Sequence, residues 1–163
     1  MPFLNKTMKL LHVIGSLGFC AALVALIMLH AALPDPEDQR EFMALRVTMG
    51  LVAGWLLLPS TLLVLVSGLL AMALSEAYKN AGWVWAKLAT GVLVMEGTLV
   101  YVQAPLEKAA ANAQALAAGM FDPGELGVLL EAERNSVGII LGVAMVNILL
   151  GVYRPRFTRR LRK

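Results

Sequence analysis

Long blocks of apolar residues, separated by short polar or charged stretches, make up most of the chain. The blocks are continuous and lack the spaced pattern of an amphipathic helix. About 20 such residues are enough for a helix to cross roughly 30 Å of hydrocarbon. The pattern therefore predicts four membrane spans, at about residues 10–32, 47–74, 82–104 and 136–153.

Composition agrees with this prediction. Of the 163 residues, 59% are hydrophobic and 15% are charged, whereas about 25% charged is usual in soluble domains. The single cysteine, Cys20, excludes an internal disulfide. The first apolar block exceeds the roughly 7–15 residues of a signal-peptide core, so we expect it to remain as a span. We predict an all-α integral membrane protein, a four-helix bundle that forms one domain over residues 1–163.

Acidic residues and prolines mark expected helix starts and bends. Asp35, Pro36 and Asp38 predict an N-cap, a first helical position and an acid in the first turn, so that a short surface helix leads into the second span. Pro59, within the second span, predicts a kink, and Pro105 predicts a kink or a new helix after the third span.

Helices three and four are expected to extend beyond the bilayer as an outer hairpin over about residues 105–135. An alanine-rich helix continues toward Gly119, and Asp122 followed by Pro123 predicts the start of a helix that runs to about Tyr153.

Basic residues suggest the orientation. Both termini are basic, and the tail 154–163 contains six positive charges, whereas the first and third loops are rich in acids. With four spans, the positive-inside rule predicts that both termini are cytoplasmic, as in a bacterial inner-membrane protein. The tail is also expected to attract anionic lipids of the bilayer. Nothing else in the sequence favours binding to nucleic acid.

The protein's two histidines both lie in the first span. His12 and His30 are eighteen residues apart, about five helical turns, so they share one face and lie about 27 Å apart along the axis. Histidine facing lipid is costly, so we expect that face to point into the bundle. For His30, near the outer loop, the favoured interpretation is structural: a hydrogen bond to a neighbouring helix or a position at the headgroup level. For His12, a structural hydrogen bond and a functional role are both open.

Two ionisable residues lie within the third span. Lys87 is expected at the depth of His12 and on the same side of the membrane, because the first and third spans run in the same direction. It either extends its amine to the membrane surface or meets His12 across the bundle. Glu96, nearer the midplane, must face the bundle, face another subunit, or be protonated. A structural hydrogen bond and proton handling are equally open for it.

Two arginines are expected near the level of His30. Arg46 begins the second span and Arg134 the fourth. They either pair with Glu131, Glu133 or loop acids, or form a cationic shelf for a ligand that bears carboxylates.

Haem requires an axial ligand, usually an imidazole, and a slot for a flat apolar ring between helices. His12 can be that ligand. Because both histidines lie on one helix, five turns apart, they cannot ligate one haem from two helices. The haem would be five-coordinate, or its second ligand would be a methionine such as Met72, expected at the depth of His12, or Lys87.

Short segments in all four spans resemble the haem-containing bacterial membrane protoporphyrinogen IX oxidases (HemJ-type) and their four-span relatives. These segments are KLLHVIG, RVTMG through LLPSTLLVLVSGLL, GWVWAKL and AERNSVGIILGVAMVNILLGVYRP. The resemblance implies that haem b is bound, that His12 ligates it and that Lys87 is its partner at the site. It adds Arg46, Arg134 and Asn135 as matching positions. The sequence departs from the family at Trp85, where the family has histidine, and after Asn135, where it has glutamate and proline.

The sequence therefore predicts a haem b-binding membrane redox protein, with tetrapyrrole oxidation and electron transfer as the two reactions considered. Candidate catalytic residues are Lys87 and Glu96, and candidate cofactor-binding residues are His12, Lys87, Met72, Arg46, Arg134, Asn135 and His30. The alternative is a non-catalytic subunit or assembly factor of a larger complex. It rests on the outer hairpin and on small residues, Gly50 and Gly54 in span two and Gly138 and Gly142 in span four, that suit helix packing within the chain, in a homo-oligomer or with partner membrane proteins. The absence of a clustered His, Met and Cys set disfavours a copper carrier.

Overall fold

The computed structural model of the chain describes residues 2–35, 38–79, 81–111 and 123–153, and every element within them is helical. Their order is α1 (Pro2–Ala31), α2 (Gln39–Val52), η1 (Ala53–Leu57), α3 (Leu58–Ala73), α4 (Glu76–Lys79), α5 (Gly82–Thr98), η2 (Leu99–Gln103), α6 (Ala104–Ala111) and α8 (Pro123–Tyr153). The predicted all-α class is confirmed.

Four helical segments are long and apolar enough to cross a membrane, as the apolar blocks predict. They cover Phe3–Ala31, Arg40–Ala73, Gly82–Leu106 and Gly127–Tyr153. The first and last are longer than predicted, because α1 begins at Pro2 and α8 at Pro123. The second span also begins earlier than the predicted residue 47, at Arg40, because α2, η1 and α3 form one uninterrupted helix. The short helix that was expected to lead into the second span therefore forms the first turns of that span.

The start of α2 corrects one prediction. Asp35 does not cap a helix: its carbonyl oxygen accepts the N–H of Asp38 (2.9 Å) in a turn. Helical hydrogen bonding begins at Asp38, whose carbonyl oxygen accepts the N–H of Phe42 (3.0 Å), and Asp38 is the N-cap residue of α2. Pro36, the predicted first helical position, lies outside the described residues.

Each of the two predicted bends coincides with a π-helical segment. η1 precedes Pro59 and η2 precedes Pro105. Proline lacks an N–H, and its ring clashes with the carbonyl of the residue four positions earlier. A π-turn moves that carbonyl aside, so the helix continues past the proline with a local distortion.

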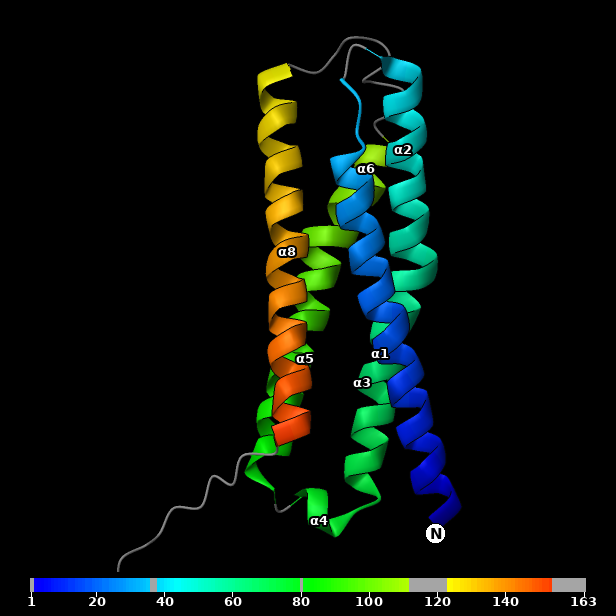
Figure 1. Cartoon of the computed structure of the whole chain (residues 1–163), viewed down its shortest axis with the longest axis vertical. Coiled ribbons are helices and arrows are strands. Elements are labelled where there is room, and N and C mark those ends of the chain that lie inside the picture. Colours follow the sequence, from blue (N-terminus) through cyan, green and yellow to red (C-terminus); the bar gives the residue numbers. More distant parts are fainter. Residues whose placement is uncertain (1, 36–37, 80, 112–122, 154–163) are drawn as a thin grey trace, which may run out of the picture.

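The four long segments stand side by side, with both ends of the described chain at one end of the bundle (Figure 1). The start of α1 and the end of α8 lie there with α4, while the α1–α2 connection and α6 lie toward the other end. Helices α1 and α3 approach each other closely. A Cβ atom on Gly15 would lie 3.0 Å from the backbone nitrogen of Val64, and one on Gly18 would clash with Ser60 Oγ.

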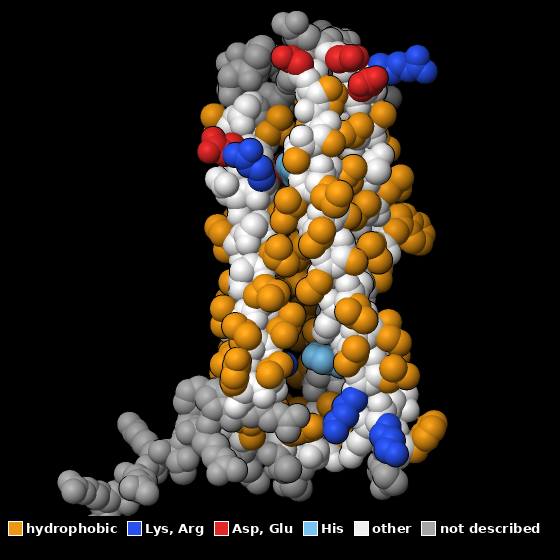
Figure 2. Space-filling model, viewed as in Figure 1, with side chains coloured by type: hydrophobic (Ala, Val, Ile, Leu, Met, Phe, Trp, Pro, Cys, Tyr) orange, Lys and Arg blue, Asp and Glu red, His pale blue; other side chains and the backbone are white. Residues whose placement is uncertain are grey.

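Large apolar side chains cover the lateral surface of the bundle (Figure 2). Trp55 is 82% exposed and Leu17 is 67% exposed. Packing against one another inside are Phe19, Leu23, Leu26, Met49 and Leu57, among others. A surface this apolar suits contact with hydrocarbon and not with water.

The predicted outer hairpin is described only in part. The helix after Pro105 is described as far as Ala111, and α8 begins at Pro123, the predicted first helical position. Gly119, the Asp122 cap and the basic tail 154–163 lie outside the described residues.

Candidate functional site

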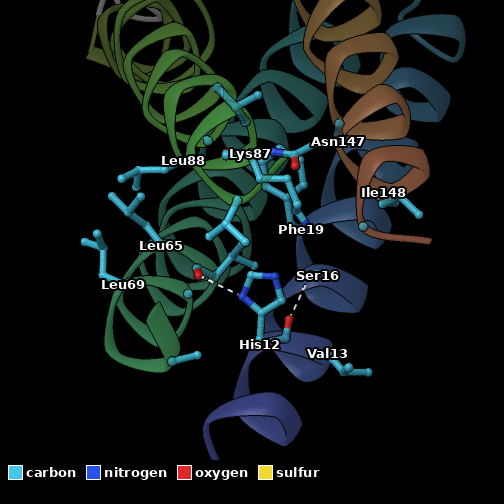
Figure 3. Close-up of a pocket in the computed structure, with 18 of the residues that line it drawn as sticks. His12, Val13, Ser16, Phe19, Leu65, Leu69, Lys87, Leu88, Asn147 and Ile148 are labelled. Atoms are coloured by element: carbon cyan, nitrogen blue, oxygen red, sulfur yellow. Dashed lines mark hydrogen bonds between the residues drawn. The ribbon is translucent and has the colours of Figure 1, made fainter. Parts of the chain in front are cut away.

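A cavity of about 630 Å³ lies between α1, α3, α5 and α8, toward the end of the bundle where α1 begins. Most of its wall is apolar, with Phe19 from α1, Leu65 from α3, Leu88 from α5 and Ile148 from α8 (Figure 3). Its volume falls within the roughly 300–1,000 Å³ typical of pockets for small molecules and cofactors.

His12 is fixed against α3 by a hydrogen bond. Its Nδ1 lies 3.0 Å from the carbonyl oxygen of Val64 and 3.2 Å from Ser67 Oγ. A carbonyl oxygen can only accept, so Nδ1 donates its hydrogen to Val64 and the neutral ring carries a lone pair on Nε2. Figure 3 shows the second ring nitrogen pointing away from α3, toward the side where Lys87 and Asn147 lie.

Two small or polar residues of α3 make this orientation possible. A Cβ atom on Gly68 would lie 3.4 Å from His12 Cε1, so the ring rests directly on the backbone of α3. Ser67 donates its hydroxyl hydrogen to the Leu63 carbonyl, which leaves its oxygen directed at His12. Within the described chain, none of the hydrogen bonds engages His12 Nε2.

Lys87 lines the same cavity from α5. Its Nζ would lie 2.7 Å from a Cβ atom on Gly151, so the glycine of α8 provides the space in which the amine sits. Asn147 of α8 donates from Nδ2 to the backbone carbonyl of Lys87 (3.5 Å). His12 and Lys87 therefore line the same cavity, which agrees with the second of the two alternatives open for Lys87 (Figure 3).

Other polar and sulfur-containing groups complete the cavity wall. Met72 is buried and lines the cavity, as expected from its depth, together with the buried Met8. The Oδ1 atom of Asn147 is buried without a hydrogen-bond partner among the described residues. The basic residues at the cavity are Lys9 and Lys87, and no carboxylate of the described chain lines it. The cavity therefore favours a ligand that is largely apolar and negatively charged.

His30 and Arg46, two of the candidate cofactor-binding residues, do not line this cavity and belong to a different cluster. Arg46 Nη1 and Nη2 donate to Glu133 Oε2 and Oε1 at 2.6 and 2.9 Å. His30 Nε2 lies 3.5 Å from the same Oε2, and its Nδ1 lies 2.9 Å from the Leu26 carbonyl oxygen. The buried acid takes up both groups in a structural network that joins α1, α2 and α8. This is the pairing with Glu133 that was left open.

Three further predicted residues point away from the cavity. Arg134 and Asn135 follow the buried Glu133 on α8, each about 100° further around the helix, and both are exposed. They therefore do not contact a ligand in the cavity. Glu96 is exposed on α5 and does not line the cavity. The two candidate catalytic residues, Lys87 and Glu96, therefore do not lie at one site. Glu96 lies nine positions after Lys87, which turns it to the opposite face of the helix.

Several residues of the site had not been singled out from the sequence. Asn147 could have been, because an amide within an apolar span marks a helix contact or a polar site. As a small residue in an apolar span, Ser67 indicates close helix packing but not a contact with His12. The roles of Gly68 and Gly151 depend on which helix faces them, and the sequence carries no signal for that.

A metal site built from several protein ligands is not present in the described part of the chain, which contains no group of three or more His, Cys, Asp or Glu residues able to hold an ion. His12 is the histidine at the cavity. No protein-family model, no curated protein and no solved structure matches the chain.

Proposed function

We propose that the chain is a membrane redox protein that binds one haem b in the cavity, with His12 as the axial ligand. The observation that carries this proposal is the fixed imidazole, with Nδ1 bonded to the Val64 carbonyl and Nε2 unused by the described residues. Histidines that ligate metals almost always donate their other ring N–H in this way, which fixes the tautomer and the ring orientation.

The other residues of the cavity fit the same group. A flat macrocycle needs an apolar slot between helices, and the 630 Å³ cavity is lined largely by aliphatic and aromatic side chains. Haem b also carries two carboxylates, and the Lys87 and Lys9 amines are the positive charges that line the cavity. Met72 is the candidate for a second ligand, because it is buried in the cavity wall.

The residues of the chain would bind and orient the group and keep water away from it. Haem, when bound, supplies one-electron chemistry whose potential depends on the axial ligand and on burial. Electron transfer and tetrapyrrole oxidation both fall in this class. Of the two candidate catalytic residues, Lys87 is the one positioned to hold a carboxylate or to hold a proton near it.

The proposal is tested by titrating the detergent-purified chain with haemin and following the Soret band. We expect saturable binding of one haem per chain, and we expect His12→Ala to abolish it. The matched control is His30→Gln, which changes the other histidine of the same helix outside the cavity and should keep the band. Folded protein that does not bind haem, or a Soret band that is the same in His12→Ala, would contradict the proposal.

The second candidate function, a non-catalytic subunit of a larger complex, is favoured by one observation. Gly54, Gly138 and Gly142 face open space, since a Cβ atom on each would meet nothing within 4 Å. They therefore do not pack helices within this chain, and they remain available for contacts between chains. A stable partner that co-purifies with a colourless chain would favour this function over haem binding.

A further inference from the structure

Glu96 lies in the middle of a membrane span and points outward. The third span covers Gly82–Leu106, so its central residue is 94 and Glu96 lies two positions beyond it, about 3 Å along the axis. Its side chain is exposed, and within the described chain no hydrogen bond or ion pair engages it.

A carboxyl group in this position is not stable against lipid. Acidic residues within spans are rare, and they almost always face other helices or a water-filled cavity, where they find partners. The structure places Glu96 on neither the bundle interior nor the cavity. Its partner therefore comes from outside the described part of the chain.

The surface around Glu96 has the pattern of a helix interface. Val92, Leu93, Leu99 and Val100 are 48%, 63%, 36% and 52% exposed. With Glu96 they form one outward face with the 3–4 residue spacing of a packing seam, which we term the Glu96 face. Only 11% of the most apolar stretch of this span is buried within the bundle, against 28% in the first span. The third span therefore has room for a neighbour.

A second copy of the chain supplies the missing partner. Copies inserted in the same direction hold every residue at the same depth, and a two-fold axis along the membrane normal places the same face against itself. The exposed basic residues of the described chain, such as Lys79, Lys108 and Arg134, lie toward the ends of the spans and not at this depth. The group that a second copy brings to Glu96 is thus its own Glu96.

We propose that the protein forms a parallel homodimer along the Glu96 face, in which the two Glu96 carboxyl groups hydrogen-bond across the two-fold axis through a shared proton. Two carboxyl groups at short distance in an apolar site cannot both be ionised, and sharing one proton satisfies both. The contact lies on the surface of the bundle, so it is independent of haem binding in the cavity.

The test is disulfide cross-linking of the full chain in phosphatidylcholine vesicles, in a Cys20→Ala background. Leu93→Cys lies on the Glu96 face, and Leu51→Cys, 55% exposed on α2, is the matched control on another span. We expect Leu93→Cys to form a cross-linked dimer many times faster than Leu51→Cys. Adding Glu96→Leu should weaken dimerisation about 3- to 30-fold, the effect of one interhelical hydrogen bond in a membrane. Glu96→Gln, whose amides can pair, should retain it.

Three outcomes would overturn the homodimer. The Leu93→Cys chain could cross-link no faster than the Leu51→Cys chain. Alternatively, the chain with Glu96→Leu could dimerise to the same extent as the chain that keeps Glu96. In membranes of the source cell, Leu93→Cys could instead form an adduct with a different protein that brings a basic span. Circular dichroism and a retained Soret band of the Glu96 variants would show that the bundle is folded, so failure of the dimer is distinguishable from failure of haem binding.

Discussion

The imidazole of His12 is the best-defined group of the cavity, because the backbone of α3 holds it from two sides. Val64 accepts from Nδ1 at 3.0 Å, and Gly68 lets the ring lie against the helix. The sequence predicts a histidine facing inward at this depth, from its position on the first span and from the cost of exposing it to lipid. It could not predict the acceptor, because nothing in the sequence sets the register between α1 and α3.

Lys87 is expected to pair with the carboxylates of a bound ligand. Lys87→Met keeps most of the side-chain volume and removes the charge. A hydrogen bond to a charged group contributes about 1.5–3 kcal/mol, so we expect haem affinity to fall at least about tenfold. The measurement is the dissociation constant from Soret titration. Lys79→Met, on α4, is the control, and an unchanged affinity for Lys87→Met would contradict the assigned role.

Arg46 is expected to stabilise the fold and not to bind a ligand. Arg46→Ala leaves Glu133 buried without the guanidinium that donates two hydrogen bonds to it. Breaking a buried ion pair by removing one member typically costs about 3–5 kcal/mol. Reversible unfolding in mixed micelles measures this loss of unfolding free energy. Arg134→Ala, at an exposed position on α8, should change it by less than about 0.5 kcal/mol. Similar losses in the two variants would contradict the structural role.

At the scale of the helices, the apolar blocks determine most of what is observed. They predict four spans, the prolines predict both distortions, and Pro123 marks the start of α8. The direction in which a side chain faces is harder to predict. Asn135, a candidate binding residue, is exposed, and Glu96, for which the bundle interior and another subunit were both open, is exposed as well. In a span that is apolar on every side, periodicity does not distinguish the face that packs from the face that meets lipid.

The contact of α1 with α3 shows the same limit. The sequence draws attention to Gly50, Gly54, Gly138 and Gly142, but a close helix approach occurs at Gly15 and Gly18. GxxxG spacing predicts close packing only where a second helix is present.

We expect Gly15→Ala to destabilise the bundle. The added Cβ atom would lie 3.0 Å from the Val64 backbone nitrogen and 3.1 Å from the Ser60 carbonyl oxygen, neither of which can move alone. Overpacking of this kind typically costs about 1–3 kcal/mol. Gly142→Ala meets open space, and alanine favours a helix over glycine by about 1 kcal/mol, so it should be neutral or stabilising. Thermal unfolding followed by circular dichroism compares the two, and equal melting temperatures would argue against tight α1–α3 packing.

At the scale of the whole molecule, both ends of the described chain lie at the same end of the bundle (Figure 1). This agrees with an even number of spans. The basic termini predict that this end is cytoplasmic. The cavity lies at the same end of the bundle, so the same prediction places it on the cytoplasmic side of the membrane.

Reporter fusions test the orientation in a bacterial inner membrane. A fluorescent protein that matures only in the cytoplasm should be active at either terminus. Alkaline phosphatase, which is active only outside, should be inactive there and active in the α1–α2 connection. Phosphatase activity at both termini would reverse the assignment and place the cavity on the outer side.

The central claim is that His12 ligates a haem in the cavity. The most direct measurement is the absorption spectrum of the full chain purified from membranes, for the wild type and for His12→Gly with and without added imidazole. The account predicts a Soret band in the wild type, its loss in His12→Gly, and its return when imidazole occupies the vacated ligand position. A folded wild type without the band, or a His12→Gly spectrum identical to that of the wild type, would contradict it.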